Sequence, residues 1–290
     1  MQPADLYMTV HVTGLPQALL LLEKATAALA ALRIKQRDAA VRDTERALET
    51  AIADAFALEW SAFHAGLRRF VKFFPVTEAL SDKDERDMLK VLASTQARRA
   101  EKLTAKLRAL LIEAFGAGWK AGATKLKVAT AFDVANPRAV RWLKTHAAEL
   151  VSGIDDTTRA RVASIVTQAV EEGWAYTKTE AALKDLYAGF SKAMPQAHIT
   201  TRAQLIAVQE ASNAYGAGQY ETGHWLAETG VAVEKAWLSA ADERVCDECD
   251  SNDGDGWIAL DQPFSSGADF EPAHVACRCC TELQRAGATT

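Results

Sequence analysis

The residues best suited to chemistry are gathered near the C-terminus. A Cys-x-x-Cys turn, Cys246-Asp-Glu-Cys249, places two thiolates on one side of a tight turn, and a second pair of donors can complete a tetrahedron around zinc. All the cysteines fall in the last 45 residues, together with His274: they are Cys246, Cys249, Cys277, Cys279 and Cys280. Because they are clustered and odd in number, and no export signal precedes them, they favour metal binding over disulfide bonds.

The second half of the metal site is less defined than the first. Its run is His274-Val-Ala-Cys277-Arg-Cys279-Cys280, so the second pair could be His274 with Cys277, Cys277 with Cys279, Cys277 with Cys280, or His274 with Cys279. We predict a structural Zn²⁺ held by four of Cys246, Cys249, His274, Cys277 and Cys279, with Cys280 as a less favoured substitute. A full set of four donors is typical of structural zinc, whereas catalytic zinc keeps one position open.

The segment around these donors has few large apolar side chains, so about 50 residues cannot build a sufficient core alone. Structural zinc contributes ~10–16 kcal/mol to folding in small peptides. Between Asp242 and Glu271 there are ten acidic residues and one basic residue, Arg244. Phosphates would be repelled, so a protein-facing or purely structural module is expected. The stretch 250–256 lacks the glycine and glutamate positions of a calcium loop, and we expect a turn between strands there.

The first half of the chain is rich in helix formers. Between Pro16 and Pro75 the only glycine is Gly66, which predicts either a helical hairpin with a break near residues 37–43 or one long helix. A second helical block is expected from Ser81, which forms a capping-box pattern with Asp84, to about residue 131. Residues 7–12 alternate like a short strand.

A basic stretch lies in the second block. Between positions 96 and 127 there are eight basic residues and only two acidic ones, Glu101 and Glu113, which gives a local charge of about +6. They form a weak candidate for contact with nucleic acid or an acidic partner: Arg98, Arg99, Lys102, Lys106, Arg108, Lys120, Lys125 and Lys127.

Shorter helices are expected further along. Asn136-Pro137 should open a helix that ends at Gly153, and a second should run from Asp155 to Gly173. Capping patterns at Thr177 with Glu180 and at Thr201 with Gln204 predict two more, and residues 231–238 read as a strand.

The expected fold is therefore mainly α: long N-terminal helices, a small helical domain, and a small C-terminal zinc-stabilised loop/β module. The predicted regions are 1–130 with long helices and the strand-like arm, 131–230 as the helical domain, and 231–290 as the acidic zinc-binding module.

Composition narrows the class of function. Apolar residues make up 49 % and charged residues 24 %, as in globular proteins. The net charge of −5 disfavours a protein whose main role is to coat nucleic acid. No apolar run approaches the ~20 residues of a membrane span, so we expect a soluble protein made inside the cell, without membrane contact. Because no catalytic constellation or phosphate-binding loop stands out, we expect neither an enzyme nor a small-molecule substrate.

The C-terminal residues resemble the phage Mu F-like minor head proteins, also called head morphogenesis proteins. The resemblance covers about residues 130–285. It is carried by Phe132-Asp-Val-Ala-Asn-Pro137, Trp142, His146, residues 153–159, Gly173, Phe190, Arg202-Ala203, Ile206-Ala207, Trp237, Asp242, Arg244-Val-Cys246, Cys249, Gly254, Pro272, His274 and Cys277-Arg-Cys279.

The resemblance implies a structural minor capsid protein of a tailed phage. Such a protein is associated with the portal vertex and takes part in head assembly, with a further role in DNA packaging or delivery. Its implied partners are the portal protein and other capsid proteins, with phage DNA as a further contact, and its implied location is the virion after synthesis in the host cytoplasm. The alternatives are a delivery module of a phage-derived toxin or effector, and a DNA-binding regulator that uses the basic stretch 96–127.

Overall fold

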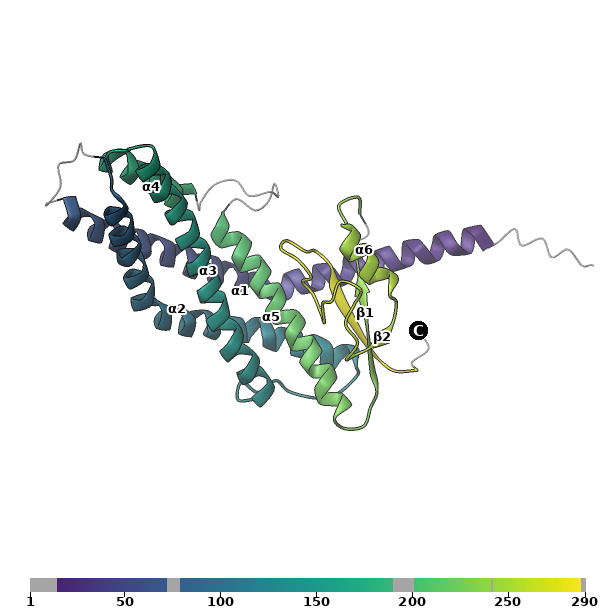
Figure 1. Cartoon of the computed structure of the whole chain (residues 1–290). Coiled ribbons are helices and arrows are strands. Elements are labelled where there is room, and N and C mark those ends of the chain that lie inside the picture. The colour runs from purple at the N-terminus through teal and green to yellow at the C-terminus, as the bar shows by residue number, and fades with distance from the viewer. Residues whose placement is uncertain (1–14, 72–78, 190–200, 241, 288–290) are drawn as a thin grey trace, which may run out of the picture.

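The computed structural model describes residues 15–71, 79–189, 201–240 and 242–287. These residues confirm a mainly helical chain with a small C-terminal strand module (Figure 1). None of the described helices has an apolar stretch long enough to cross a bilayer. The strand-like arm expected at residues 7–12 lies outside the described residues. The elements are α1 (Leu15–Val71), α2 (Asp82–Lys125), α3 (Pro137–Glu171), α4 (Tyr176–Gly189), α5 (Arg202–Ala227), β1 (Val233–Leu238), α6 (Asp247–Gly254), β2 (Ile258–Ala259) and β3 (Cys280–Arg285).

Helix α1 is continuous, so the hairpin alternative with a break near residues 37–43 is wrong and the long-helix alternative is confirmed. Residues 37–43 contain no glycine or proline, and Val41, Leu48 and Ile52 are almost fully buried along one face of α1. A continuous buried stripe keeps a helix intact because its burial outweighs the small differences in intrinsic propensity. Figure 1 shows α1 running along the other helices and continuing past the C-terminal module.

Three of the expected helix starts are confirmed. Asn136 caps α3, where its side chain accepts from the Arg138 amide at 2.9 Å and Pro137 is the first helical residue. Ser81 caps α2, because its side chain accepts a hydrogen bond from the Asp84 amide while the Asp84 carboxylate accepts one from the Ser81 amide. Thr201 caps α5, because its side chain accepts from the Gln204 amide at 2.9 Å. The box expected at Thr177 is wrong, because α4 already begins at Tyr176.

The expected stop at Gly153 is also wrong. Helix α3 runs without interruption from Pro137 to Glu171. A Cβ at Gly153 would meet nothing within 4 Å, whereas its neighbours Val151 and Ile154 are buried. Their packing compensates for the cost of about 1 kcal/mol that a glycine brings to a helix interior.

Glycines bring α2 and α5 into backbone contact. A Cβ added at Gly118 would lie 1.9 Å from the Tyr215 carbonyl oxygen, and one at Gly218 would lie 2.1 Å from the Phe115 carbonyl oxygen. Only glycine leaves room for such an approach. One hydrophobic core then extends from Val41 to Ala217 and includes side chains from α1 to α5. The division of these helices into regions at residue 130 stays a prediction.

The C-terminal module holds a small antiparallel sheet with the strand order β2-β1-β3, and the strand expected at residues 231–238 is found as β1. Strand β3 joins the module to the long helices. The Lys125 ammonium of α2 donates to the Thr281 carbonyl oxygen at 2.7 Å, and Ala30 of α1 packs with Leu238 and Cys280. The module is therefore fixed to the same helices that form the main core.

Candidate metal centre

The first pair of donors is placed by a short helix. Cys246 is the N-cap of α6 and Cys249 lies in its first turn, with the Asp250 amide donating to the Cys246 carbonyl oxygen at 2.9 Å. The turn expected between strands at residues 250–256 is therefore wrong, because α6 occupies residues up to Gly254. This start favours metal binding, since the positive end of a helix stabilises thiolates.

The second pair of donors lies on a tight turn before β3. The Cys277 amide donates to the His274 carbonyl oxygen at 3.2 Å, and Ala276 has a positive φ of 64°. The Ala276 amide donates to Oε1 of Gln209 on α5 at 3.1 Å. The turn is thus held in a strained backbone conformation by a helix of the main core.

Beyond the turn, the Arg278 guanidinium forms two contacts of 2.5 Å with the Asp242 carboxylate. These contacts lower the pKa of Asp242 well below its usual range. The pair ties the segment that precedes the first turn to the residue between Cys277 and Cys279, so it fixes the two halves of the candidate site relative to each other.

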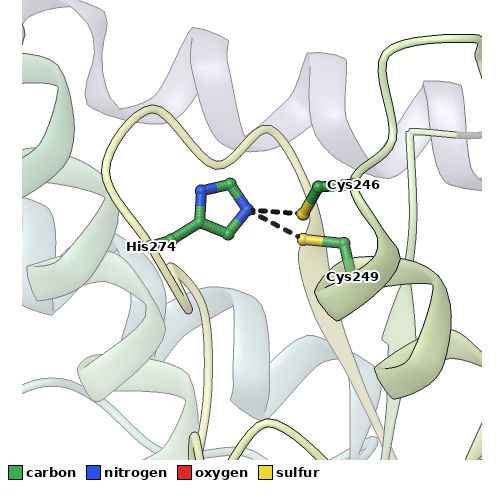
Figure 2. Close-up of side chains that lie close together, drawn as sticks. All are labelled: Cys246, Cys249 and His274. Carbon is green, nitrogen blue, oxygen red and sulfur yellow. Dashed lines mark hydrogen bonds between the residues drawn. The ribbon is translucent and has the colours of Figure 1, made fainter.

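The donor atoms converge. Nε2 of His274 lies 3.1 Å from Sγ of Cys246 and 3.2 Å from Sγ of Cys249 (Figure 2), and Sγ of Cys249 lies 3.7 Å from Sγ of Cys277. In tetrahedral zinc sites with Zn–S near 2.3 Å and Zn–N near 2.0–2.1 Å, the edges of the tetrahedron are about 3.8 Å for S···S and about 3.6 Å for S···N. The S···S separation agrees with this size, and the S···N separations need to widen by less than 1 Å.

The other nitrogen of His274 orients the ring. Nδ1 lies 3.0 Å from the Val275 carbonyl oxygen, where it donates as an N–H. The lone pair of the neutral imidazole is then on Nε2, which is the atom that faces the two sulfurs. A backbone partner of this kind fixes the tautomer of metal-binding histidines.

Cys249 is common to two groups of donors. The first group is Cys246, Cys249 and His274, and the second is Cys249, Cys277 and Cys279; in each, the donor atoms lie within 4.8 Å of one another. All five favoured candidates therefore come together around one cysteine. Cys280 belongs to neither group, and its buried side chain packs with Ala30 and Leu238 instead.

The thiols are set up to respond to a cation. Burial, and then the charge of Cys277, raises the pKa of Cys249 above its usual range. The hydrogen bond with Cys279, followed by burial, raises the pKa of Cys277. Without a cation these sulfurs keep their protons at neutral pH, whereas coordination by a divalent ion deprotonates a thiol outright. Zinc binding should therefore release protons.

The donors form part of the module's own core. Cys249, Cys277 and Cys279 pack with Trp237 and Phe264, whose rings meet edge to face at 5.1 Å. These two aromatic side chains are the only large ones among the fully buried members of this cluster in the described residues. A metal in this position would replace missing apolar area as the source of stability. The residues present therefore fit a closed, structural zinc site.

One residue at the site escaped the sequence analysis. Arg37 of α1 is 4 % exposed, and its guanidinium donates to the carbonyl oxygens of Cys279 and Arg278. No motif marks Arg37, because its partners are backbone atoms about 240 positions further along the chain. Gln209, which holds Ala276, was missed for the same reason.

The structure places the predicted basic residues in different surroundings. Arg99 is turned inward, where it pairs with Asp155 and with Glu59, a fully buried carboxylate that also accepts from Tyr187. Lys125 contacts β3, and Arg98 bonds to Ser94 on its own helix. The remaining members are Lys106, which lies 3.9 Å from Asp54, and Lys102, Arg108, Lys120 and Lys127, which are all exposed.

Residues 160–282 match the family model described as Phage Mu protein F like protein. This segment runs from the second half of α3 to β3 and contains every candidate metal ligand. A search of curated proteins found no match, and neither did a search of solved structures. Over residues 160–282 the match supports the resemblance of the chain to the phage Mu F-like proteins.

Proposed function

We propose that this protein is a structural component of a tailed-phage head, that it acts beside the portal during head assembly, and that Zn²⁺ folds its C-terminal module into a docking piece. The observation that carries the proposal is the position of the donor cluster. It lies inside the segment that matches the family and is built into the module's core rather than into a substrate cavity.

A structural role for the metal follows from the supply of donors. His274 and the sulfurs of Cys246, Cys249 and Cys277 already make four, which is the usual number for structural zinc. The second turn is held from outside by Gln209 and Arg37. Zinc would then join the first turn on α6 to a second turn that the helices already support. In this position the metal supplies stability.

A protein partner suits the charge of the module. Helix α6 presents Asp247, Glu248 and Asp250 as exposed carboxylates in its first turn. This surface would repel DNA and would complement a basic surface of a portal or capsid protein. The pairing of Arg99 inside the fold and the contact of Lys125 with β3 leave fewer of the eight basic residues for the alternative of a DNA-binding regulator.

The function is tested by co-expression with the portal protein of the same phage. Affinity purification of the full chain should recover the portal protein, and Cys249→Ser should abolish recovery, whereas Cys280→Ser should leave it unchanged. Both cysteines are buried, so this pair separates loss of metal from loss of a buried thiol. Recovery of the portal protein with neither the wild type nor Cys280→Ser would overturn the proposed function.

The metal is tested separately by elemental analysis of protein purified without a chelator. We expect about one zinc per chain, as for a single tetrahedral site. A value well below one, or disulfide bonds among these cysteines, would contradict the zinc assignment even if the portal protein were recovered.

A further inference from the structure

A second site is suggested by a hollow where α1, α2, α5 and β3 meet. Its volume is about 440 Å³, and its lining includes Ala117 and Ala121 on one turn of α2. Small side chains at these positions leave space between the helices. The hollow is separate from the metal donors, although Cys280 and Arg37 line it.

Cations dominate the lining. Arg33 and Arg37 reach it from α1, and Lys120 and Lys125 reach it from α2. The carboxylate of Glu282 lies 3.0 Å from Arg33 and 3.3 Å from Lys125. Arg37 pairs with the half-exposed Asp38 at 2.8 Å. Lys120 is exposed and forms no ion pair with any described residue. The hollow therefore carries more positive charge than its carboxylates balance.

Two further groups shape the floor. Glu271 is fully buried, and burial raises its pKa. Gln219 is 1 % exposed and lines the hollow; its Nε2 donates to Glu271 at 3.4 Å. The Oε1 atom of Gln219 is buried and has no hydrogen-bond partner among the described residues. A buried amide oxygen without a donor is costly, so it points to a ligand that carries an O–H or N–H group.

We propose that this hollow binds a phosphate group with a free O–H, either inorganic phosphate or a phosphate monoester. Its anionic oxygens would accept from Lys120 and the neighbouring cations, and its O–H would donate to Oε1 of Gln219. Near neutral pH inorganic phosphate always keeps at least one O–H, whereas a phosphate monoester, with a second pKa of about 6, keeps its proton for part of the time. Sulfate and the phosphodiester backbone of DNA lack this O–H and should bind less well.

The position of the hollow gives the anion a structural effect. It would contact α1, α2 and α5 beside β3, at the junction where the module joins the long helices. A ligand that binds only this assembled arrangement stabilises it by mass action. The inference rests on neither the zinc assignment nor portal binding.

The test is calorimetric titration of inorganic phosphate into the full-length protein, with ionic strength held constant by sodium chloride. We expect saturable binding at one site, and about tenfold weaker binding of sulfate. Lys120→Gln should weaken phosphate binding about tenfold, since it removes one charge-assisted contact, whereas Lys120→Arg should retain binding. Lys102→Gln is the matched control, because Lys102 is exposed on the same helix and does not line the hollow.

Several results would overturn the proposal. One is a titration in which the heat of phosphate binding does not saturate. Another is an equal weakening of phosphate binding by Lys120→Gln and Lys102→Gln, which would indicate general charge screening. Equal affinity for sulfate and phosphate would remove the role of Gln219. A short DNA duplex that binds more tightly than phosphate, and loses affinity with Lys102→Gln, would show that the basic residues act as a nucleic-acid surface instead. Inorganic phosphate and methyl phosphate compared in the same assay would distinguish a free ion from a monoester as the ligand.

Discussion

The contact between α1 and the second metal turn can be tested by Arg37→Met. Methionine keeps an unbranched apolar stem but removes every donor and the charge. A hydrogen bond from a charged donor contributes about 1.5–3 kcal/mol, and a buried carbonyl that loses its donor costs about 1–3 kcal/mol. The bond to Cys279 falls in this class, whereas the one to Arg278, at 3.5 Å, contributes little.

Two further effects of Arg37→Met change the expected loss in the free energy of unfolding. The ion pair with Asp38 is lost as well, but that carboxylate is 51 % exposed, so the pair contributes at most about 1 kcal/mol. In the opposite direction, the variant no longer has to strip water from a guanidinium that is 5 % exposed. We expect a net loss of about 2–3 kcal/mol in the free energy of unfolding, which corresponds to about a 30- to 150-fold change in the equilibrium constant.

The assay is urea denaturation of the zinc-loaded protein, combined with hydrogen exchange of the β3 amides. Arg46→Met is the matched control, because Arg46 lies on the same helix with a side chain that is 73 % exposed. It should change stability by no more than about 0.5 kcal/mol. If Arg37→Met also stayed within this range, or if β3 exchanged no faster, then Arg37 would not anchor the module and the reasoning would fail.

Three other perturbations give separate tests. Cys249→Ser should reduce bound zinc from about one per chain to near zero, because Cys249 is common to both donor groups. Cys280→Ser should keep the zinc, because Cys280 belongs to neither group. Equal zinc loss in both variants would contradict the assigned ligands. Burial lowers the pKa of Lys235 to about 8 from its ordinary 10.5, so the proton is held more tightly in the unfolded state and the wild type should gain stability as the pH rises from 8 to 10.5. Urea denaturation at pH 8 and at pH 10.5 should show this gain in the wild type but not in Lys235→Met. An equal change in the free energy of unfolding of both proteins would refute the assignment to Lys235. Gly118→Ala should destabilise the α2–α5 contact by about 3 kcal/mol or more, because the new Cβ meets backbone, while Gly153→Ala, in open space, should stabilise α3 by up to about 1 kcal/mol in thermal unfolding.

Local signals in the sequence predicted local structure well. The capping box at Ser81, the cap at Thr201 and the strand that became β1 each depend on residues within a few positions of one another. The Cys-x-x-Cys spacing belongs to the same class, since a turn of four residues determines where its two sulfurs point. These features could be predicted because backbone geometry alone decides them.

The errors share a different cause. Gly153 was expected to end a helix and the segment 250–256 was expected to be a turn, yet α3 and α6 continue through these positions. In α3, buried neighbours on both sides outweigh the glycine. In α6, the helix begins at the first ligand, and Asn252 and Asp255 at its end bond to Ser266 and Ser265. Tertiary contacts override local propensity at such places, and one sequence gives no access to them.

The candidate metal site was likewise predictable only in part. Its donor types could be read from the sequence, but the choice among His274, Cys277, Cys279 and Cys280 could not. The structure separates Cys280 from the others because it is the first residue of β3, where it pairs with Leu238 and its side chain packs against α1. The alternation of side chains along a strand puts successive residues on opposite sides. Here Cys279 packs with Trp237 and Phe264, whereas Cys280 packs with Ala30 and Leu238, so the two adjacent cysteines lie in different clusters.

The two halves of the metal site are supported unequally, and this determines what zinc contributes. The second turn is held by Gln209 of α5, by Arg37 of α1 and by the pairing of β3 with β1. The first turn depends on α6, a helix of eight residues, which is too short to be stable by itself in water. Helix α6 also has attachments of its own: the Ser239 hydroxyl donates to the Asp253 carboxylate at 2.6 Å, and the Ser266 amide donates to Oδ1 of Asn252 at 2.9 Å. Zinc should therefore add an attachment at the N-terminal end of α6, where the other contacts do not reach, so that the acidic face is held more firmly against the sheet when the metal is bound.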